Sequence, residues 1–292
     1  MTRLPALVAH LAATVSAQRT AIEQVLSRAD RLDDPRVLHD LRVALRRTAA
    51  VARLTRGIPD PGSGDPLRLT ARNLRRSLSP SRTREVCAAL LAVRFRRDPV
   101  RRKAAAALAE RIAPKPKETR PRRRAGDRRL LLLRRAFALR DAELARLARP
   151  FSFLGGGASD AELAARVRRR LRKKRRRLLA AGVPDPGALH AARIAAKDFR
   201  YALEFVRDIV PGVPEILKAF QAFQDTAGDA HDRIELIALV EGFSKRGSPP
   251  LRRAARTLLP ALRLDAERAV RRAQAAYRLL AARLEVTRMT FE

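Results

Sequence analysis

The chain has 292 residues and 46% of them are hydrophobic, which is enough apolar side chain for a sizeable core in one large domain or two of ordinary size. The 64 Lys and Arg residues against 30 Asp and Glu residues give a formal net charge of +34, and a compact chain tolerates such self-repulsion best beside a polyanion. The single cysteine, Cys87, excludes an intramolecular disulfide framework and any zinc site made of several cysteines, and agrees with a reducing compartment.

The first segment, residues 1–32, predicts an amphipathic helix and not a removed leader. It begins like a signal peptide, but His10 interrupts the apolar stretch and the helical pattern continues to about Leu32. No apolar run in the sequence approaches the ~20 residues of a membrane-spanning helix. We therefore expect no membrane segment and a cytoplasmic location.

The later segments are rich in Ala, Leu and Arg, which favour helices, and aromatic residues make up only 4% of the chain. Stretches with Pro, Gly, Asp or Ser separate these segments, so the predicted fold class is all-α. Residues 114–127 combine prolines with many cations and indicate a linker. Within a single domain of residues 1–292, we expect residues 1–113 to form a first helical half and residues 128–292 a second.

A phrase near the start of the chain returns in its second part. "DPRVLHDLRVALRR", residues 34–47, is matched by "DPGALHAARIAAKDFRYALE", residues 185–204. Each copy has a histidine followed by a row of cations, and the surrounding helix breaks repeat as well, so we predict two pseudo-equivalent helical bundles. The identical positions are Asp34/Asp185, Pro35/Pro186, Leu38/Leu189, His39/His190, Arg42/Arg193 and Ala44/Ala195.

At ~100° per residue, each copy forms an amphipathic helix with one cationic face. Val37, Leu41 and Leu45 lie opposite that face in the first copy, and Ala192 and Phe199 do so in the second. A solvated surface helix is one explanation, and a ligand surface is the other. We favour a ligand surface because the pattern occurs twice and acidic residues are nearly missing from it. The cationic faces comprise His39, Arg42, Arg46 and Arg53 in the first copy and His190, Arg193, Lys197, Arg200, Tyr201 and Arg207 in the second.

Two such helices facing each other across the junction of the halves would form one basic central groove or pore. A chain of phosphates would gain there from many simultaneous contacts and from counterion release. Arginine, which far outnumbers lysine, suits bidentate phosphate contacts, although a GC-rich genome also produces this excess. Aromatic residues on the faces are limited to Tyr201, which disfavours single-stranded nucleic acid because its bases stack on aromatic platforms.

The two phrases resemble the paired signature of the CHAD domain, the conserved-histidine α-helical domain, and the resemblance covers essentially the whole chain. It rests on the histidine, the arginine three residues later and the Arg or Lys four beyond, with the "K-x-x-R-Y-x-x-E" continuation in residues 197–204. Residues 77–86 and 223–236 resemble a second element of the family. They depart from its pattern at Ser79-Pro80, Thr83 and His231-Asp232. These departures affect the expected turn geometry and any local ion pair, and leave the basic faces unchanged.

The resemblance implies two four-helix-bundle-like halves with internal two-fold pseudo-symmetry, a basic central surface and binding of inorganic polyphosphate. A dense basic run precedes the second copy, and an extension of the site and a solvated face are both open for it. The histidines also have two open roles, donation from both ring nitrogens to phosphate oxygens or a backbone hydrogen bond at the helix start. The contacts implied by the resemblance are His39, Arg42, Arg46, His190, Arg193, Lys197 and Arg200, and the basic run contains Arg168, Arg169, Arg172, Lys173 and Arg176.

The sequence contains no catalytic constellation, so we expect a protein that is not an enzyme and needs no cofactor or metal. A metal phosphohydrolase needs several further His and Asp ligands beside the pairs His39-Asp40 and His231-Asp232, and the chain has only 4 histidines. Two glutamates spaced two apart, which the triphosphate-tunnel domain requires, and a Gly-rich phosphate loop are also missing.

The main hypothesis is non-catalytic polyphosphate binding, with localisation at polyphosphate granules. The alternative is a general nucleic-acid or nucleoid-associated polyanion-binding protein, held by the same charge.

Overall fold

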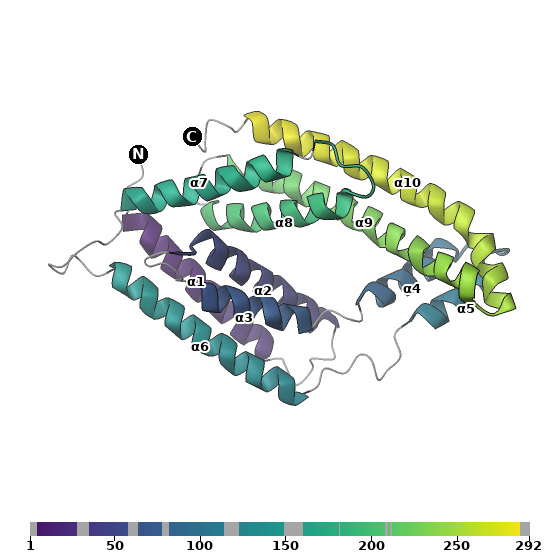
Figure 1. Ribbon diagram of the computed structural model, residues 1–292, viewed down its shortest axis with the longest axis horizontal. Coiled ribbons are helices and arrows are strands. Elements are labelled where there is room, and N and C mark those ends of the chain that lie inside the picture. Colours follow the sequence, from purple (N-terminus) through teal and green to yellow (C-terminus); the bar gives the residue numbers. More distant parts are fainter. Residues whose placement is uncertain are drawn as a thin grey trace.

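The computed structural model describes residues 5–27, 35–57, 64–77, 82–113, 123–148, 160–180, 182–207, 210 and 212–286. Over these residues the chain is all-helical, which confirms the predicted fold class (Figure 1). No helix among them is long and apolar enough to cross a membrane. The helices are α1 (Pro5–Leu26), α2 (Pro35–Leu54), α3 (Asp65–Ser77), α4 (Arg82–Arg94), α5 (Arg102–Ile112), α6 (Arg123–Ala148), α7 (Asp160–Leu179), α8 (Leu189–Val206), α9 (Val213–Arg246) and α10 (Pro249–Val286).

The larger hydrophobic core joins α1, α2, α3, α6, α7 and α8 with the first part of α9 and the last part of α10. Leu41 and Leu45 of α2 and Ala192 and Phe199 of α8 are buried in it, as their positions opposite the cationic faces predict. Full burial of a large apolar side chain stabilises the fold by about 1.5–3 kcal/mol. The apolar faces of α2 and α8 therefore turn inward, and this fixes the direction of their cationic faces.

A smaller core lies at the other end of the molecule, where α4 and α5 pack against the hairpin of α9 and α10 (Figure 1). Cys87, Leu91 and Phe95 of α4 meet Val240 of α9 and Leu258 of α10 there. The two long helices of the hairpin thus contribute to both cores, and α4 packs on α9.

The sequence analysis assigns residues 128–292 to the second half, but helix α6, which lies mostly in this range, packs against helices of the first half. It begins at Arg123, so it includes the last residues of the expected linker 114–127, and it packs against α1 and α3. Arg19 of α1 pairs with Asp141 at 2.5 Å. A proline-rich, charged stretch marks a break between helices, but its composition does not determine which core the following helix joins.

A buried ion pair locks α6 to the segment that precedes α3. Arg140 Nη1 lies 2.7 Å from Glu143 Oε2, and Arg140 Nη2 donates to the backbone O of Thr55 at 3.2 Å. The same Glu143 oxygen accepts the backbone N–H of Gly64 at 3.1 Å. Gly64 has a φ of 79°, which suits glycine, and it leads directly into α3. These contacts hold the start of α3, the helix that carries Arg75.

Candidate functional site

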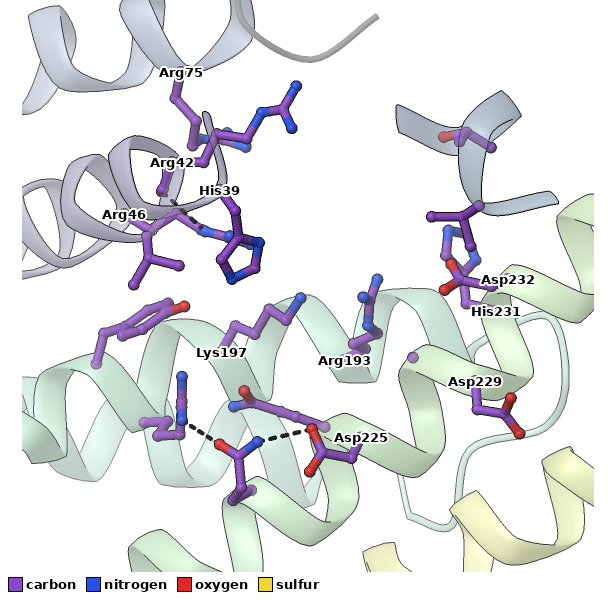
Figure 2. A pocket seen from close by; sticks show the side chains of 18 residues that line it. His39, Arg42, Arg46, Arg75, Arg193, Lys197, Asp225, Asp229, His231 and Asp232 are labelled. Carbon is purple, nitrogen blue, oxygen red and sulfur yellow. Dashed lines mark hydrogen bonds between the residues drawn. The ribbon is translucent and has the colours of Figure 1, made fainter. Parts of the chain in front are cut away.

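A polar cavity of about 630 Å³ lies where α2, α3, α4, α8 and α9 meet (Figure 2). Both copies of the repeated phrase contribute to it, from α2 and from α8. The cavity is lined by His39, Arg42, Val43, Arg46, Arg75, Thr83, Val86, Arg193, Lys197, Arg200, Tyr201, Gln221, Gln224, Asp225, Gly228, Asp229, His231 and Asp232.

Helix α2 supplies His39, Arg42 and Arg46, which are three and four residues apart and project from one side of the helix. Arg42 is only 8% exposed, although it lies on the cationic face. Arg46 folds back along the helix and donates from Nε to the backbone O of Arg42 at 3.2 Å. Arg42 and Arg46 are therefore partly removed from water, and charge interactions between them and a ligand are stronger than in open solvent.

Helix α8 forms the opposite wall with Arg193, Lys197, Arg200 and Tyr201. In Figure 2 Arg193 and Lys197 point from α8 toward α2, and His39 points back from α2. The Arg200 guanidinium lies 4.9 Å from the ring centre of Tyr201, and its Nη1 donates to Gln221 Oε1 at 2.6 Å. Arg200 also pairs with Glu204, whose Oε1 lies 3.6 Å from its Nε, so the ring, the amide and this carboxylate together hold the guanidinium in position.

The environment of Lys197 lowers its pKa to about 7. Burial is the main cause, and the like charges of Arg193, Arg46 and Arg200 add to it, while Asp232 acts in the opposite direction. An anion bound in the cavity would raise the pKa of Lys197, because a nearby negative charge stabilises the charged ammonium form. The cavity is therefore built with an excess of positive charge.

Helix α9 forms a third wall, which the cationic faces in the sequence do not reveal. Within α9, Ala227, Gly228 and Ala230 are buried, and these small residues bring the helix close to α8. The signal that points to this wall is the resemblance of residues 223–236 to a second element of the family. Thr83, from the matching element of the first part, also lines the cavity, while Ser79 and Pro80 lie outside the described residues.

The α9 wall also brings aspartates to the cavity, and two of them are held by protein groups. Asp229 pairs with Arg233 at 3.0 Å and with Arg272 at 3.1 Å, and in Figure 2 its carboxylate points away from Lys197. Asp225 Oδ1 accepts a hydrogen bond from Gln221 Nε2 at 2.7 Å. Asp229 is thus neutralised by two arginines, and Asp225 is hydrogen-bonded to an amide. The two carboxylates therefore offset only part of the cationic charge from α2 and α8.

The two histidines of the repeated phrase lie in different places. His39 lines the cavity, whereas His190 is exposed at the start of α8 and lies with its ring centre 4.4 Å from that of His231, which does line it. Burial, and then His190 and Arg193, lower the pKa of His231. Before α8 begins, Asp185 Oδ1 accepts the backbone N–H of Ala188 at 2.7 Å, and the N-cap residue Ala188 makes no side-chain capping hydrogen bond.

The basic run before the second copy lies on α7 and contributes nothing to the lining of the cavity. Arg169 and Lys173 line a separate hollow of about 390 Å³ together with Arg166 and Arg170. Arg168, Arg172 and Arg176 are exposed on the same helix. The structure thus brings together His39, Arg42, Arg46, Arg193, Lys197 and Arg200, and it places His190 at the rim and Arg169, Arg172, Lys173 and Arg176 elsewhere.

The family model of the CHAD domain matches residues 9–241, which is most of the chain. The chain belongs to the CHAD domain family. The solved CHAD domain from the plant Ricinus communis is 24% identical to this CHAD protein, with a TM-score of 0.63 over 96% of this chain and 91% of the plant chain. PptA from Streptomyces chartreusis is 19% identical, with a TM-score of 0.62 over 93% of this chain and 99% of its own. At these identities the similarity demonstrates a shared fold. No curated protein sequence matches this chain.

Proposed function

We infer that this CHAD protein binds inorganic polyphosphate in the cavity between α2, α8 and α9. One observation carries the proposal: two helices with the same phrase place Arg42 and Arg46 opposite Arg193, Lys197 and Arg200 around one cavity of about 630 Å³. A thin polyanion can contact both helices at once, and a wide duplex cannot enter a space of this size.

The energetics favour a polymer over a single phosphate. Each guanidinium can donate two parallel hydrogen bonds to phosphate oxygens, and hydrogen bonds to charged groups contribute about 1.5–3 kcal/mol each. Successive phosphates of one chain would satisfy several cations and release their counterions together, so the affinity would fall steeply with salt. Lys197 would regain its charge in the process.

We propose further that the protein holds polyphosphate without cleaving or extending it. Among the described residues, no three His, Cys, Asp or Glu side chains are grouped as a metal ion would need. Asp229 is already paired with Arg233 and Arg272, and Asp225 with Gln221, which leaves both poorly placed to act as a general base. Localisation at polyphosphate granules would follow from binding alone.

The test is a calorimetric titration of long-chain polyphosphate into the protein at near-physiological salt, with duplex DNA of equal phosphate content as competitor. We expect tight binding that the DNA does not displace. Displacement by DNA in proportion to its phosphate content would instead identify a general polyanion binder. Chain length after long incubation with Mg²⁺ or Mn²⁺ should be unchanged, and a release of phosphate would contradict the non-catalytic role.

A further inference from the structure

Helix α7 carries a run of charge that the cavity does not use. Between Arg166 and Arg177 the only residues that are not Lys or Arg are Val167 and Leu171, and both are buried in the larger core. No acidic residue falls within this run. A helix of this composition repels itself along its length, because like charges three and four residues apart face each other. Some compensation for the charge is therefore required.

The inward-facing cations of α7 are compensated by the protein. Arg166 donates to the backbone O of Gly57 at 3.0 Å, and Arg170 donates to the backbone O of Leu54 and of Arg56, both at 2.5 Å. These arginines thereby satisfy the carbonyl groups at the end of α2.

Two further cations of α7 also have protein partners. Lys174 pairs with Asp198 of α8, and Arg175 pairs with Glu285 of α10 at 2.9 Å. Together with the arginines that cap α2, these contacts fasten α7 to its neighbours and leave its other side exposed.

The outward-facing cations have no such partners. None of them forms an ion pair or a side-chain hydrogen bond with any residue that the structure describes, and all of them are exposed. Burial is the main cause that lowers the pKa of Arg170, and the like charges of Arg166, Arg169 and Arg56 add to it, so one outward-facing cation, Arg169, contributes. These outward-facing residues are Arg168, Arg169, Arg172, Lys173, Arg176 and Arg177.

The outward-facing cations form two parallel rows along the helix. Arg168, Arg172 and Arg176 follow one another at intervals of four residues, and so do Arg169, Lys173 and Arg177. Four residues advance an α-helix by about 6 Å, and neighbouring residues are turned by about 100°. The rows therefore lie on the two flanks of one exposed ridge, each with a positive charge about every 6 Å, and Arg169 and Lys173 also line the hollow of about 390 Å³ beside it.

We propose that this ridge of α7 is a second anion-binding surface, separate from the cavity, that binds the phosphate backbone of duplex nucleic acid without sequence preference. The major groove of a B-form DNA duplex, the duplex meant here, is about 12 Å wide and admits one α-helix, and a phosphate strand lies on each side of it. Two rows of cations on the flanks of one helix can contact both strands at once. Arginine dominates both rows, as expected for bidentate contacts with phosphate.

Other anionic partners fit the ridge less well. A membrane-binding helix buries apolar side chains in the lipid, whereas the apolar residues of this run, Val167 and Leu171, face the core. A thin polyphosphate chain would follow one row and leave the other unused. The ridge is also separate from the cavity, because none of its six cations lines it. The inference therefore stands independently of polyphosphate binding.

The test measures binding of a labelled 20-base-pair duplex at several salt concentrations to the full chain and to two variants. One variant carries Arg168→Gln, Arg172→Gln, Lys173→Gln and Arg176→Gln. The matched control removes the same charge from exposed arginines of α10, which also have no ion-pair partner among the described residues, as Arg252→Gln, Arg253→Gln, Arg256→Gln and Arg268→Gln.

With six phosphate contacts, the wild-type affinity should fall about a thousandfold between 50 and 200 mM salt. The α7 variant should lower the slope of log K against log salt by about 3 to 4, and the α10 control by less than about 1. Equal effects of the two variants would overturn the proposal, as would binding to phosphatidylserine vesicles with no binding to the duplex. A third variant, Arg42→Gln with Arg193→Gln, removes cations of the cavity alone and should retain duplex binding. A failure of polyphosphate to bind the cavity would therefore leave the duplex result unaffected.

Discussion

The guanidinium group of Arg193 lies against the backbone of α9 at Gly228. A Cβ atom on Gly228 would be 3.5 Å from Nη2 and 3.7 Å from Nε of Arg193, which is ordinary van der Waals contact. Gly228 is buried within α9, so a main cation of the cavity rests on a surface that has no side chain of its own. The close packing of α8 and α9 thus sets the position of Arg193.

Substitution of Gly228 tests this arrangement. Gly228→Ala should raise the free energy of unfolding by about 0.5–1 kcal/mol, because alanine is favoured over glycine inside a helix and its methyl group fits beside Arg193. Gly228→Leu should push the guanidinium aside and weaken polyphosphate binding by about tenfold, the loss of about one charged hydrogen bond. Urea denaturation and calorimetry measure the two effects. Equal weakening of binding by both variants would show that Arg193 does not depend on this contact.

The faces of α2 and α8 could be predicted from the sequence, since helical periodicity separates Leu41 and Phe199, which are buried, from Arg46 and Lys197, which line the cavity. Local pattern determines such faces because the apolar side must find a core. The burial of Arg42 could not be predicted in this way, because it depends on the neighbours that pack beside α2.

Long-range packing accounts for the parts that the sequence did not reveal. The α9 wall arises where buried small residues such as Gly228 let that helix approach α8, and its charge pattern alone resembles that of any mixed surface helix. The place of α6 depends on distant partners such as Arg19 and Thr55. The two-fold relation between the halves stays a prediction.

Polyphosphate binding should take up a proton at Lys197. Its pKa of about 7 leaves the amine mostly neutral at pH 8 in the free protein, and a bound polyanion favours the charged form. Affinity should therefore rise as the pH falls from 9 toward 6. Calorimetry at pH 8 in buffers of different ionisation enthalpy counts the protons. Lys197→Arg should keep the affinity and abolish most of the uptake, while unchanged uptake would assign it to His39 or His231. Lys174→Arg, outside the cavity, is the matched control.

Burial of Lys197 should also lower the free energy of unfolding, by an amount that depends on pH. Its pKa is lower in the folded chain than the ordinary 10.5, so the unfolded chain binds more protons between pH 7 and pH 10.5, and stability rises with pH in that window. The cost is fully present below pH 7. Lys197→Met should therefore raise the Tm at pH 6 by about 3 °C or more, and by less at pH 9.5, while it weakens polyphosphate binding. A gain that does not change with pH would contradict this assignment.

Cys87 should be chemically inert in the folded protein. It is fully buried, and burial, followed by the charges of Asp232 and Glu235, raises its pKa to about 11. Since only the thiolate reacts, alkylation by iodoacetamide at pH 8 should be about a hundredfold slower than in urea, where the ordinary pKa near 8.5 returns. Similar rates in both conditions would show that the smaller core opens readily.

The most direct test of the central claim compares two double variants that remove the same charge. Arg42→Gln with Arg193→Gln removes one cation from each motif helix, and glutamine avoids placing a carboxylate at the buried position 42. Arg122→Gln with Arg123→Gln removes two cations from the chain beside the start of α6. Long-chain polyphosphate is titrated calorimetrically into each at near-physiological salt. If α2 and α8 form one polyphosphate site, the first pair should weaken binding by about a hundredfold and the second by less than about threefold. Equal weakening by both pairs would mean that net charge, and not the repeated phrase, binds the polymer.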